Sequence, residues 1–177
     1  MQIDFSKNHF ELFHLPVAYP IDLPALEQAY REVQREVHPD RFANSSGAEQ
    51  RLAAQWATQV NEAYRTLKSP LARGRYLLKL HGIDTEEESN TAMPVDFLIQ
   101  QMEWREAVEG AKQSKDEVAL ERLTSQKRDE EKRLFVLLAS QLGDDAVRAD
   151  GRETVRKLRF LEKLGEEIDD AIERLEG

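Results

Sequence analysis

The stretch "REVQREVHPDRFANSS", residues 31–46, begins as a helix and then stops. Two valines lie four residues apart among charged residues, as on an amphipathic helix. The tripeptide His38-Pro39-Asp40 then ends the helix, because proline fixes φ near about −65° and lacks the next hydrogen-bond donor. A polar loop follows. The stretch therefore predicts a stiff turn that presents a histidine and an acid from the end of a helix.

The sequence on both sides of this turn has the periodicity of helices. Apolar residues recur at steps of three and four before the turn and again after it, which predicts two long amphipathic helices. A short helix is expected before Pro16, and another from Pro70 to a stop at Gly82. The expected core stripes are Leu23, Leu26, Tyr30, Val33 and Val37 in the first long helix, and Leu52, Trp56, Val60, Ala63 and Leu67 in the second.

The composition limits the class of protein. Of 177 residues 40% are hydrophobic and 33% charged, with few glycines and prolines, which favours an all-α fold. A net charge of −9 argues against a nucleic-acid or anionic-membrane binder. The absence of cysteine removes disulfides and cysteine-ligated metal sites. No leader peptide and no apolar run of about 20 residues is visible, so we expect a cytoplasmic protein. Nothing demands an oligomer, and we expect a monomer.

The charge divides the chain into two modules. Residues 1–82 carry 10 Lys and Arg against 9 Asp and Glu, a net charge of +1. Residues 83–177 carry 15 against 25, a net charge of −10. The stretch "IDTEEESNTAMP", residues 83–94, has no periodicity and is interpreted as a linker. The predicted domains are therefore 1–82 and 95–177 on either side of this linker.

Residues 95–177 predict a second helical module. Apolar periodicity indicates helices at roughly 95–112, 116–142 and 145–175, whose short connections favour an antiparallel three-helix bundle. Leu134, Leu137, Leu138 and Leu142 are the expected core residues of the middle helix.

The first module resembles a J-domain, the module that activates DnaK-type ATPase chaperones. The resemblance is carried by "FELFHLP", "ALEQAYREVQREV", the HPD turn and "NEAYRTLKSP". It implies a helical hairpin whose HPD loop docks where the nucleotide and substrate domains of the chaperone meet and promotes ATP hydrolysis. The chaperone-binding residues that it implies are His38, Pro39 and Asp40, with Arg31, Arg35 and Arg41 beside them.

The helix before the turn departs from the family pattern. General J-domains have a markedly basic helix there, which meets an acidic surface on the chaperone. In this sequence Glu27, Glu32 and Glu36 are interleaved with the arginines. Steering towards a generic acidic surface should be weaker, so a dedicated chaperone partner is expected.

The whole chain is similar to the HscB family, the J-domain co-chaperones of iron–sulfur cluster assembly, in its bacterial form. The stretches that carry this resemblance are "HPDRFA", "YLLKLHGID", "DFLIQQMEWREAV" and "TVRKLRFLEKL". It implies a specialised DnaK-type partner like HscA, and a cluster scaffold protein like IscU bound to the C-terminal bundle. It also implies an adaptor without catalysis of its own. A J-domain adaptor for a different client is the alternative.

One helix of the bundle carries more apolar residues than one face can hold. Phe97, Trp104, Val108 and Ala111 form the natural core stripe of "DFLIQQMEWREAV". Leu98, Ile99 and Met102 do not all fit on that stripe, which indicates either an exposed patch for a partner or a wide core stripe. Phe160 falls off the stripe of its own helix and should be exposed. The family's scaffold-binding site matches Leu98, Ile99, Met102, Glu103, Glu106 and Phe160.

An enzyme is the competing class of function. The four histidines, His9, His14, His38 and His81, show no metal-binding spacing. There is no glycine-rich phosphate loop and no GxSxG elbow. The sequence therefore predicts no catalytic residues, no metal and no cofactor.

Overall fold

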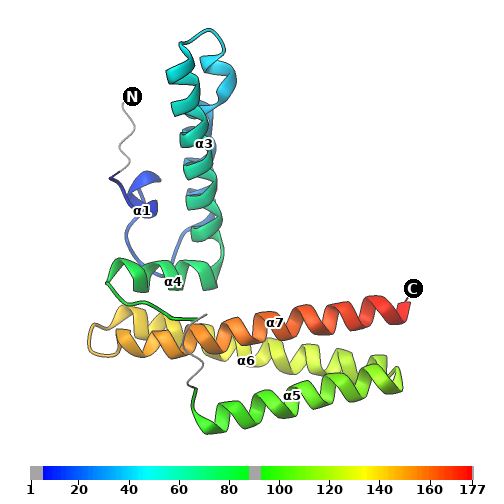
Figure 1. Cartoon of the computed structure of the whole chain (residues 1–177). Helices are drawn as coiled ribbons and strands as arrows, with labels where there is room; N and C mark the ends of the chain where they lie inside the picture. Colours follow the sequence, from blue (N-terminus) through cyan, green and yellow to red (C-terminus); the bar gives the residue numbers. More distant parts are fainter. Residues whose placement is uncertain (1–5, 88–92, 177) are drawn as a thin grey trace. The chain divides into compact units, whose positions relative to one another are not determined.

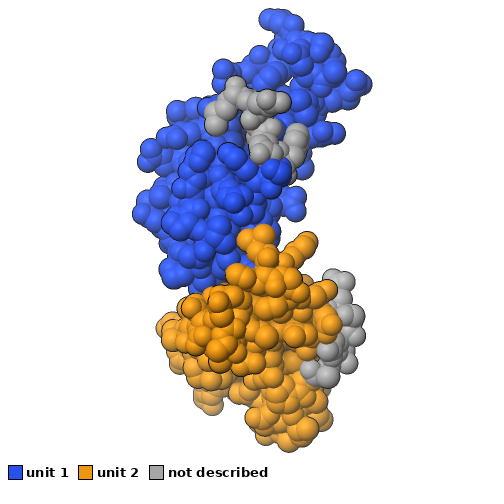
Figure 2. All heavy atoms as spheres, turned by 90° about the vertical axis from the view of Figure 1, so that its left-hand side faces the viewer, with its two compact units in different colours: residues 1–77 blue, residues 78–177 orange. Residues whose placement is uncertain are grey.

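The structure of the protein is a computed structural model that describes residues 6–87 and 93–176. The chain forms two compact units, residues 1–77 and 78–177, coloured separately in Figure 2. Every regular element in the described ranges is helical, which confirms the predicted all-α fold class. The proposed linker, residues 83–94, includes residues 88–92, which lie outside the described part of the chain.

The first unit contains α1 (His9–Leu12), α2 (Leu23–Val37), the 3₁₀ turn η1 (Pro39–Phe42) and α3 (Gly47–Lys68) (Figure 1). α4 (Pro70–Leu80) follows, and its end belongs to the second unit. The side chain of Asp22 caps α2 by accepting a hydrogen bond from the backbone N–H of Ala25 at 3.0 Å. α2 and α3 pack together, and α1 packs on α3.

The core of the first unit follows most of the predicted stripes, with two corrections. Leu26, Val37, Trp56, Val60, Ala63 and Leu67 are buried, as predicted, whereas Tyr30 and Val33 are only half-buried. Leu23 is 45% exposed because it is the first residue of α2 and lies at the end of the packed face. Leu52 is 47% exposed and Ala53 is buried in its place. The element packed against this end of α3 is η1, and the buried face is offset by one residue there.

The second unit contains α5 (Val95–Ser114), α6 (Glu117–Gly143), the 3₁₀ turn η2 (Arg148–Asp150) and α7 (Gly151–Glu176). The three long helices lie side by side in antiparallel order (Figure 1). Lys115 takes the left-handed conformation (φ 53°) that ends α5, and Asp116 caps α6. Leu134, Leu138 and Leu142 are buried as predicted, whereas Leu137 is 39% exposed because it lies off their stripe.

The third helix of the bundle begins later than the predicted residue 145. The carboxylate of Asp144 accepts a hydrogen bond from the backbone N–H of Ala146 at 2.9 Å, which forms a local turn. Arg148 pairs with the carboxylate of Asp145, and η2 completes the connection. Local polar contacts therefore hold residues 144–150 in a turn, and α7 starts at Gly151.

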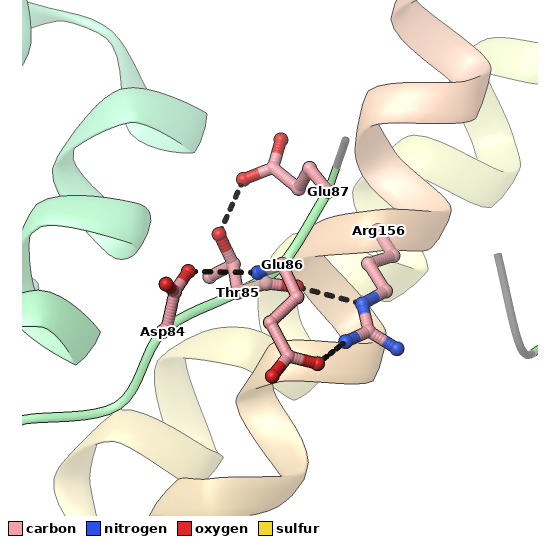
Figure 3. A network of polar contacts seen from close by, with 5 residues as sticks. All are labelled: Asp84, Thr85, Glu86, Glu87 and Arg156. Carbon is pink, nitrogen blue, oxygen red and sulfur yellow. Dashed lines mark hydrogen bonds and ion pairs between the residues drawn. The ribbon is translucent and has the colours of Figure 1, made fainter. Parts of the chain in front are cut away.

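Residues 84–87 are held against α7 by a polar network, shown in Figure 3. Gly82 (φ 72°) ends α4, as predicted. Arg156 of α7 donates from Nε to the carbonyl of Thr85 at 2.7 Å and from Nη2 to the carboxylate of Glu86 at 3.1 Å. The hydroxyl of Thr85 donates to Glu87 at 2.7 Å. These residues belong to the second unit, and they fix the position of the Arg156 guanidinium.

Candidate functional site

The HPD turn lies at the end of α2. Val37, the last residue of the helix, is buried and anchors the turn in the core. His38 takes φ −59° and ψ 129°, which breaks the helix, and Pro39 then opens η1. The side chains of His38 and Asp40 are 52% and 90% exposed. The turn therefore has a buried base and presents both polar side chains to solvent.

One hydrogen bond orders the turn internally. The backbone N–H of Asp40 donates to Nδ1 of His38 at 3.3 Å. The carboxylate of Asp40 lies 3.5 Å from the same nitrogen. A single imidazole nitrogen cannot accept the first contact and donate to the second. When Nδ1 accepts from the backbone, the ring is neutral, its proton is on Nε2, and the Asp40 carboxylate is available to an external donor.

The loop after the turn is fixed from α3. Gln50 donates from its side-chain amide to the carbonyls of Ala43 and Ser45, at 3.1 and 3.2 Å. Ser46 and Glu49 form a reciprocal capping box at the start of α3. Hydrogen bonds from the backbone N–H and hydroxyl of Ser46 lower the pKa of the Glu49 carboxyl. The role of Gln50 was missed from the sequence, because backbone carbonyls leave no pattern in the residue types.

The three arginines predicted beside the turn are all exposed. Arg31 forms an ion pair with Glu27 one helical turn away, with 3.7 Å between nitrogen and oxygen. Arg41 donates from Nη1 to the carbonyl of Arg35 at 3.4 Å, so it contacts the last turn of α2. The interleaved acids therefore engage one of the two helical arginines within the helix itself.

The second predicted site forms an exposed surface on α5. Leu98, Ile99 and Met102 are 39%, 53% and 66% exposed, so their predicted exposure is confirmed. We call these three residues the apolar patch. Glu103 and Glu106 are exposed beside it. Phe97, Val108 and Ala111 are buried, whereas Trp104 of the expected core stripe is only half-buried. The patch is therefore separate from the core face of α5, and its binding role stays a prediction.

Phe160 is less exposed than its position in the sequence predicts. Its ring is half-buried and meets the buried ring of Phe97 edge to face, with 5.7 Å between centroids at 85°. The guanidinium of Arg105 lies 5.6 Å from the centroid of the Phe160 ring. Phe160 thus contributes to the packing between α5 and α7, and only part of its surface is open to a partner.

The described ranges contain neither a candidate membrane-spanning helix nor a candidate metal site. Within residues 6–87 and 93–176, no helix is long and apolar enough to cross a membrane. In the same ranges, no group of three or more His, Asp or Glu side chains is arranged to hold a metal ion. The exposed side chains of the HPD turn and the apolar patch remain the strongest candidates.

Comparison with known proteins places the chain in one family. A family model described as the HscB C-terminal oligomerisation domain matches residues 93–169. The co-chaperone protein HscB homolog of Paraburkholderia xenovorans is 52% identical over 172 residues, covering 97% of this chain and 98% of the relative. The chain belongs to the HscB family.

Solved HscB structures share the fold. Chaperone HscB from Vibrio cholerae matches with a TM-score of 0.84 at 35% identity, covering 96% of this chain and 99% of that one. Human co-chaperone HscB matches with a TM-score of 0.85 at 32% identity, covering 94% of this chain and 83% of that one. The predicted HscB resemblance is therefore confirmed. The first unit is the J-domain of this HscB-family chain, and the second is its C-terminal helical domain.

The description of the matching family model refers to oligomerisation. The monomer that we expect from the sequence stays a prediction for this HscB-family chain.

Proposed function

We propose that this protein stimulates the ATPase of a specialised DnaK-type chaperone of the HscA kind. It also delivers an iron–sulfur scaffold protein of the IscU kind to that chaperone. The observation that carries the proposal is the presence of two exposed candidate binding surfaces in one chain. The first unit presents the HPD turn, and the second presents the apolar patch with its acidic neighbours. The protein works in the cytoplasm as an adaptor without catalysis of its own.

The geometry of the HPD turn suits transient binding to a chaperone. Pro39 and the hydrogen bond from Asp40 N–H to His38 restrict the turn before it meets a partner. Little conformational entropy is then lost on docking. The exposed carboxylate of Asp40 can accept charge-assisted hydrogen bonds from an arginine of the chaperone. The turn acts by shifting the chaperone towards its hydrolysing state, and it contributes no group to the reaction.

The apolar patch suits a protein partner. Large side chains that stay exposed on a helix typically mark interaction sites when they lie together. The neighbouring carboxylates of Glu103 and Glu106 would rim the interface, where they affect association rate and salt dependence more than affinity.

Affinity capture from a lysate tests the proposed function. The full chain should capture an IscU-type scaffold and an HscA-type chaperone, and the purified protein alone should hydrolyse no ATP. Asp40→Asn should lose the chaperone and keep the scaffold. Capture of a mixture of unfolded chains would instead support a J-domain adaptor for other clients.

We expect this protein to be a poor activator of the general DnaK chaperone. The positive charge of α2 is partly offset by the carboxylates of Glu27, Glu32 and Glu36. Glu27 also forms an ion pair with Arg31. Electrostatic steering towards an acidic chaperone surface is therefore weakened. Steady-state ATPase assays with DnaK and the HscA-type chaperone side by side measure the difference. Equal stimulation of both chaperones would contradict this reading of the three glutamates.

A further inference from the structure

A groove of about 250 Å³ lies between α5 and α7 in the second unit. Two of its lining residues, Leu98 and Arg105, lie seven apart on α5 and so share one face of that helix. On α7 the lining residues recur at steps of one, three and four, which also define a single face. They are Arg156, Arg159, Phe160 and Lys163.

The charge of this groove is opposite to the charge of the region that contains it. Residues 83–177 have a net charge of −10. Among the described residues, the groove is nevertheless lined by four cationic side chains, those of Arg105, Arg156, Arg159 and Lys163, and by one carboxylate, that of Glu87. Clefts lined by one sign of charge focus the electrostatic potential. The groove is therefore a local positive site on an acidic surface.

Two of these cations are held by the protein itself. Arg156 binds the carbonyl of Thr85 and the carboxylate of Glu86. Arg159 pairs with Glu162 one turn further along α7. Within the described part of the chain, Arg105 and Lys163 form no ion pair. Arg105 lies instead over the ring of Phe160. Two cationic groups thus remain to bind an external anion.

The groove borders the apolar patch through Leu98, which belongs to both. Successive residues of an α-helix are rotated by about 100°. Relative to Leu98, Arg105 then lies about 20° to one side, and Met102, Glu106 and Glu103 lie about 40°, 80° and 140° to the other. Ile99 lies at about 100° on that same side. The patch therefore has Arg105 along one edge, Glu106 between its apolar residues and Glu103 beyond the opposite edge. Such a surface distinguishes the two orientations in which a partner could bind.

We propose that the groove binds an acidic side chain, Asp or Glu, of the scaffold protein while apolar residues of the same partner cover the apolar patch. This inference rests on the proposed scaffold-binding function and deepens it. The volume of the groove is below the ~300–1,000 Å³ that is typical of small-molecule pockets, and the groove has room for a side chain of a partner protein. A carboxylate there would accept hydrogen bonds from Arg105, whose planar guanidinium binds carboxylates in two-point geometry. Lys163 would supply a second charge.

Charge reversal with a matched control tests this inference. Calorimetric titration with the purified, cluster-free IscU-type scaffold should show that Arg105→Glu with Lys163→Glu weakens binding by more than about tenfold at about 50 mM salt. The difference from the unaltered protein should shrink at about 500 mM salt, where exposed charges are screened. The control, Arg122→Glu with Lys132→Glu, makes the same change in net charge at exposed positions of α6. It should change the affinity less than about twofold.

A second variant keeps the test valid if the double reversal disturbs the packing of Phe160. Lys163→Glu alone leaves the contact between Arg105 and Phe160 in place and should still weaken binding more than Lys132→Glu. Equal losses in the groove and control variants would overturn the inference and leave scaffold binding itself standing. If the unaltered protein fails to bind the scaffold, the proposed function is wrong and the inference falls with it.

Discussion

Asp40→Asn is expected to abolish stimulation of the HscA-type chaperone's ATPase. The Asp40 side chain is 90% exposed and contributes no core contact, so the fold should not change. The substitution removes a charge while keeping the size of the side chain. Hydrogen bonds to charged groups contribute about 1.5–3 kcal/mol, and a loss of that size lowers affinity roughly ten- to a hundredfold. Steady-state ATP hydrolysis at limiting co-chaperone measures the effect.

The matched control for this variant is Asp169→Asn, an exposed aspartate on α7. It should stimulate the chaperone like the unaltered protein, and both variants should have the same circular dichroism and bind the scaffold equally. His38→Gln is expected to follow Asp40→Asn, because it removes the imidazole nitrogen that orders the backbone of the turn. Full stimulation by Asp40→Asn would rule out the proposed role of the HPD turn.

The helices and the HPD turn could be predicted because local rules decide them. Proline fixes the end of α2, Asp22 and Ser46 cap helices in the way that their residue types favour, and apolar periodicity marks the buried faces. Side chains at the ends of helices were less predictable. Leu23 and Leu52 continue their stripes in the sequence but lie where the packed neighbour ends or changes.

The contacts between distant segments could not be predicted. The packing of residues 84–87 on α7 depends on Arg156, which is about 70 residues further along the chain. Acidic residues without periodicity favour a linker, and no local signal indicates a partner at that distance. The groove between α5 and α7 was missed for the same reason. Arg156, Arg159 and Lys163 recur at helical spacing, but only the fold brings Arg105 beside them.

The apolar patch was predictable in part. Leu98, Ile99 and Met102 were identified because one helix face cannot hold every apolar residue of α5. The same reasoning treated Phe160 as exposed, whereas its ring packs edge to face on Phe97. A helical wheel gives the direction in which a side chain points. It does not show how far the neighbouring helix covers that side chain. Phe160 therefore combines a packing role with its proposed role in binding.

Leu98→Ala with Met102→Ala is expected to weaken scaffold binding by more than about tenfold. Truncating an apolar anchor at the centre of an interface typically reduces the binding free energy by about 1–2 kcal/mol. A change of about 1.4 kcal/mol corresponds to a tenfold change in affinity. Both side chains are exposed in the free protein. The free energy of unfolding should therefore change by less than about 0.5 kcal/mol for each. Calorimetric titration with the scaffold, beside a thermal melt, measures the two effects separately.

Val118→Ala with Val136→Ala is the matched control, because these valines of α6 are 64% and 73% exposed and lie outside the patch. This control should bind the scaffold normally. Glu103→Ala or Glu106→Ala should weaken binding less than the patch variant, and the loss should fade at high salt, because rim charges mainly affect association rate.

Phe160→Ala separates docking from packing. It should weaken scaffold binding and also lower the melting temperature, because it removes the ring that contacts Phe97. Replacing a fully buried phenylalanine with alanine lowers the free energy of unfolding by about 3–5 kcal/mol. The loss at the half-buried Phe160 should be smaller. The patch variant should lose binding at unchanged stability. If it instead melts earlier and binds normally at low temperature, Leu98 and Met102 stabilise the bundle and the scaffold binds another surface.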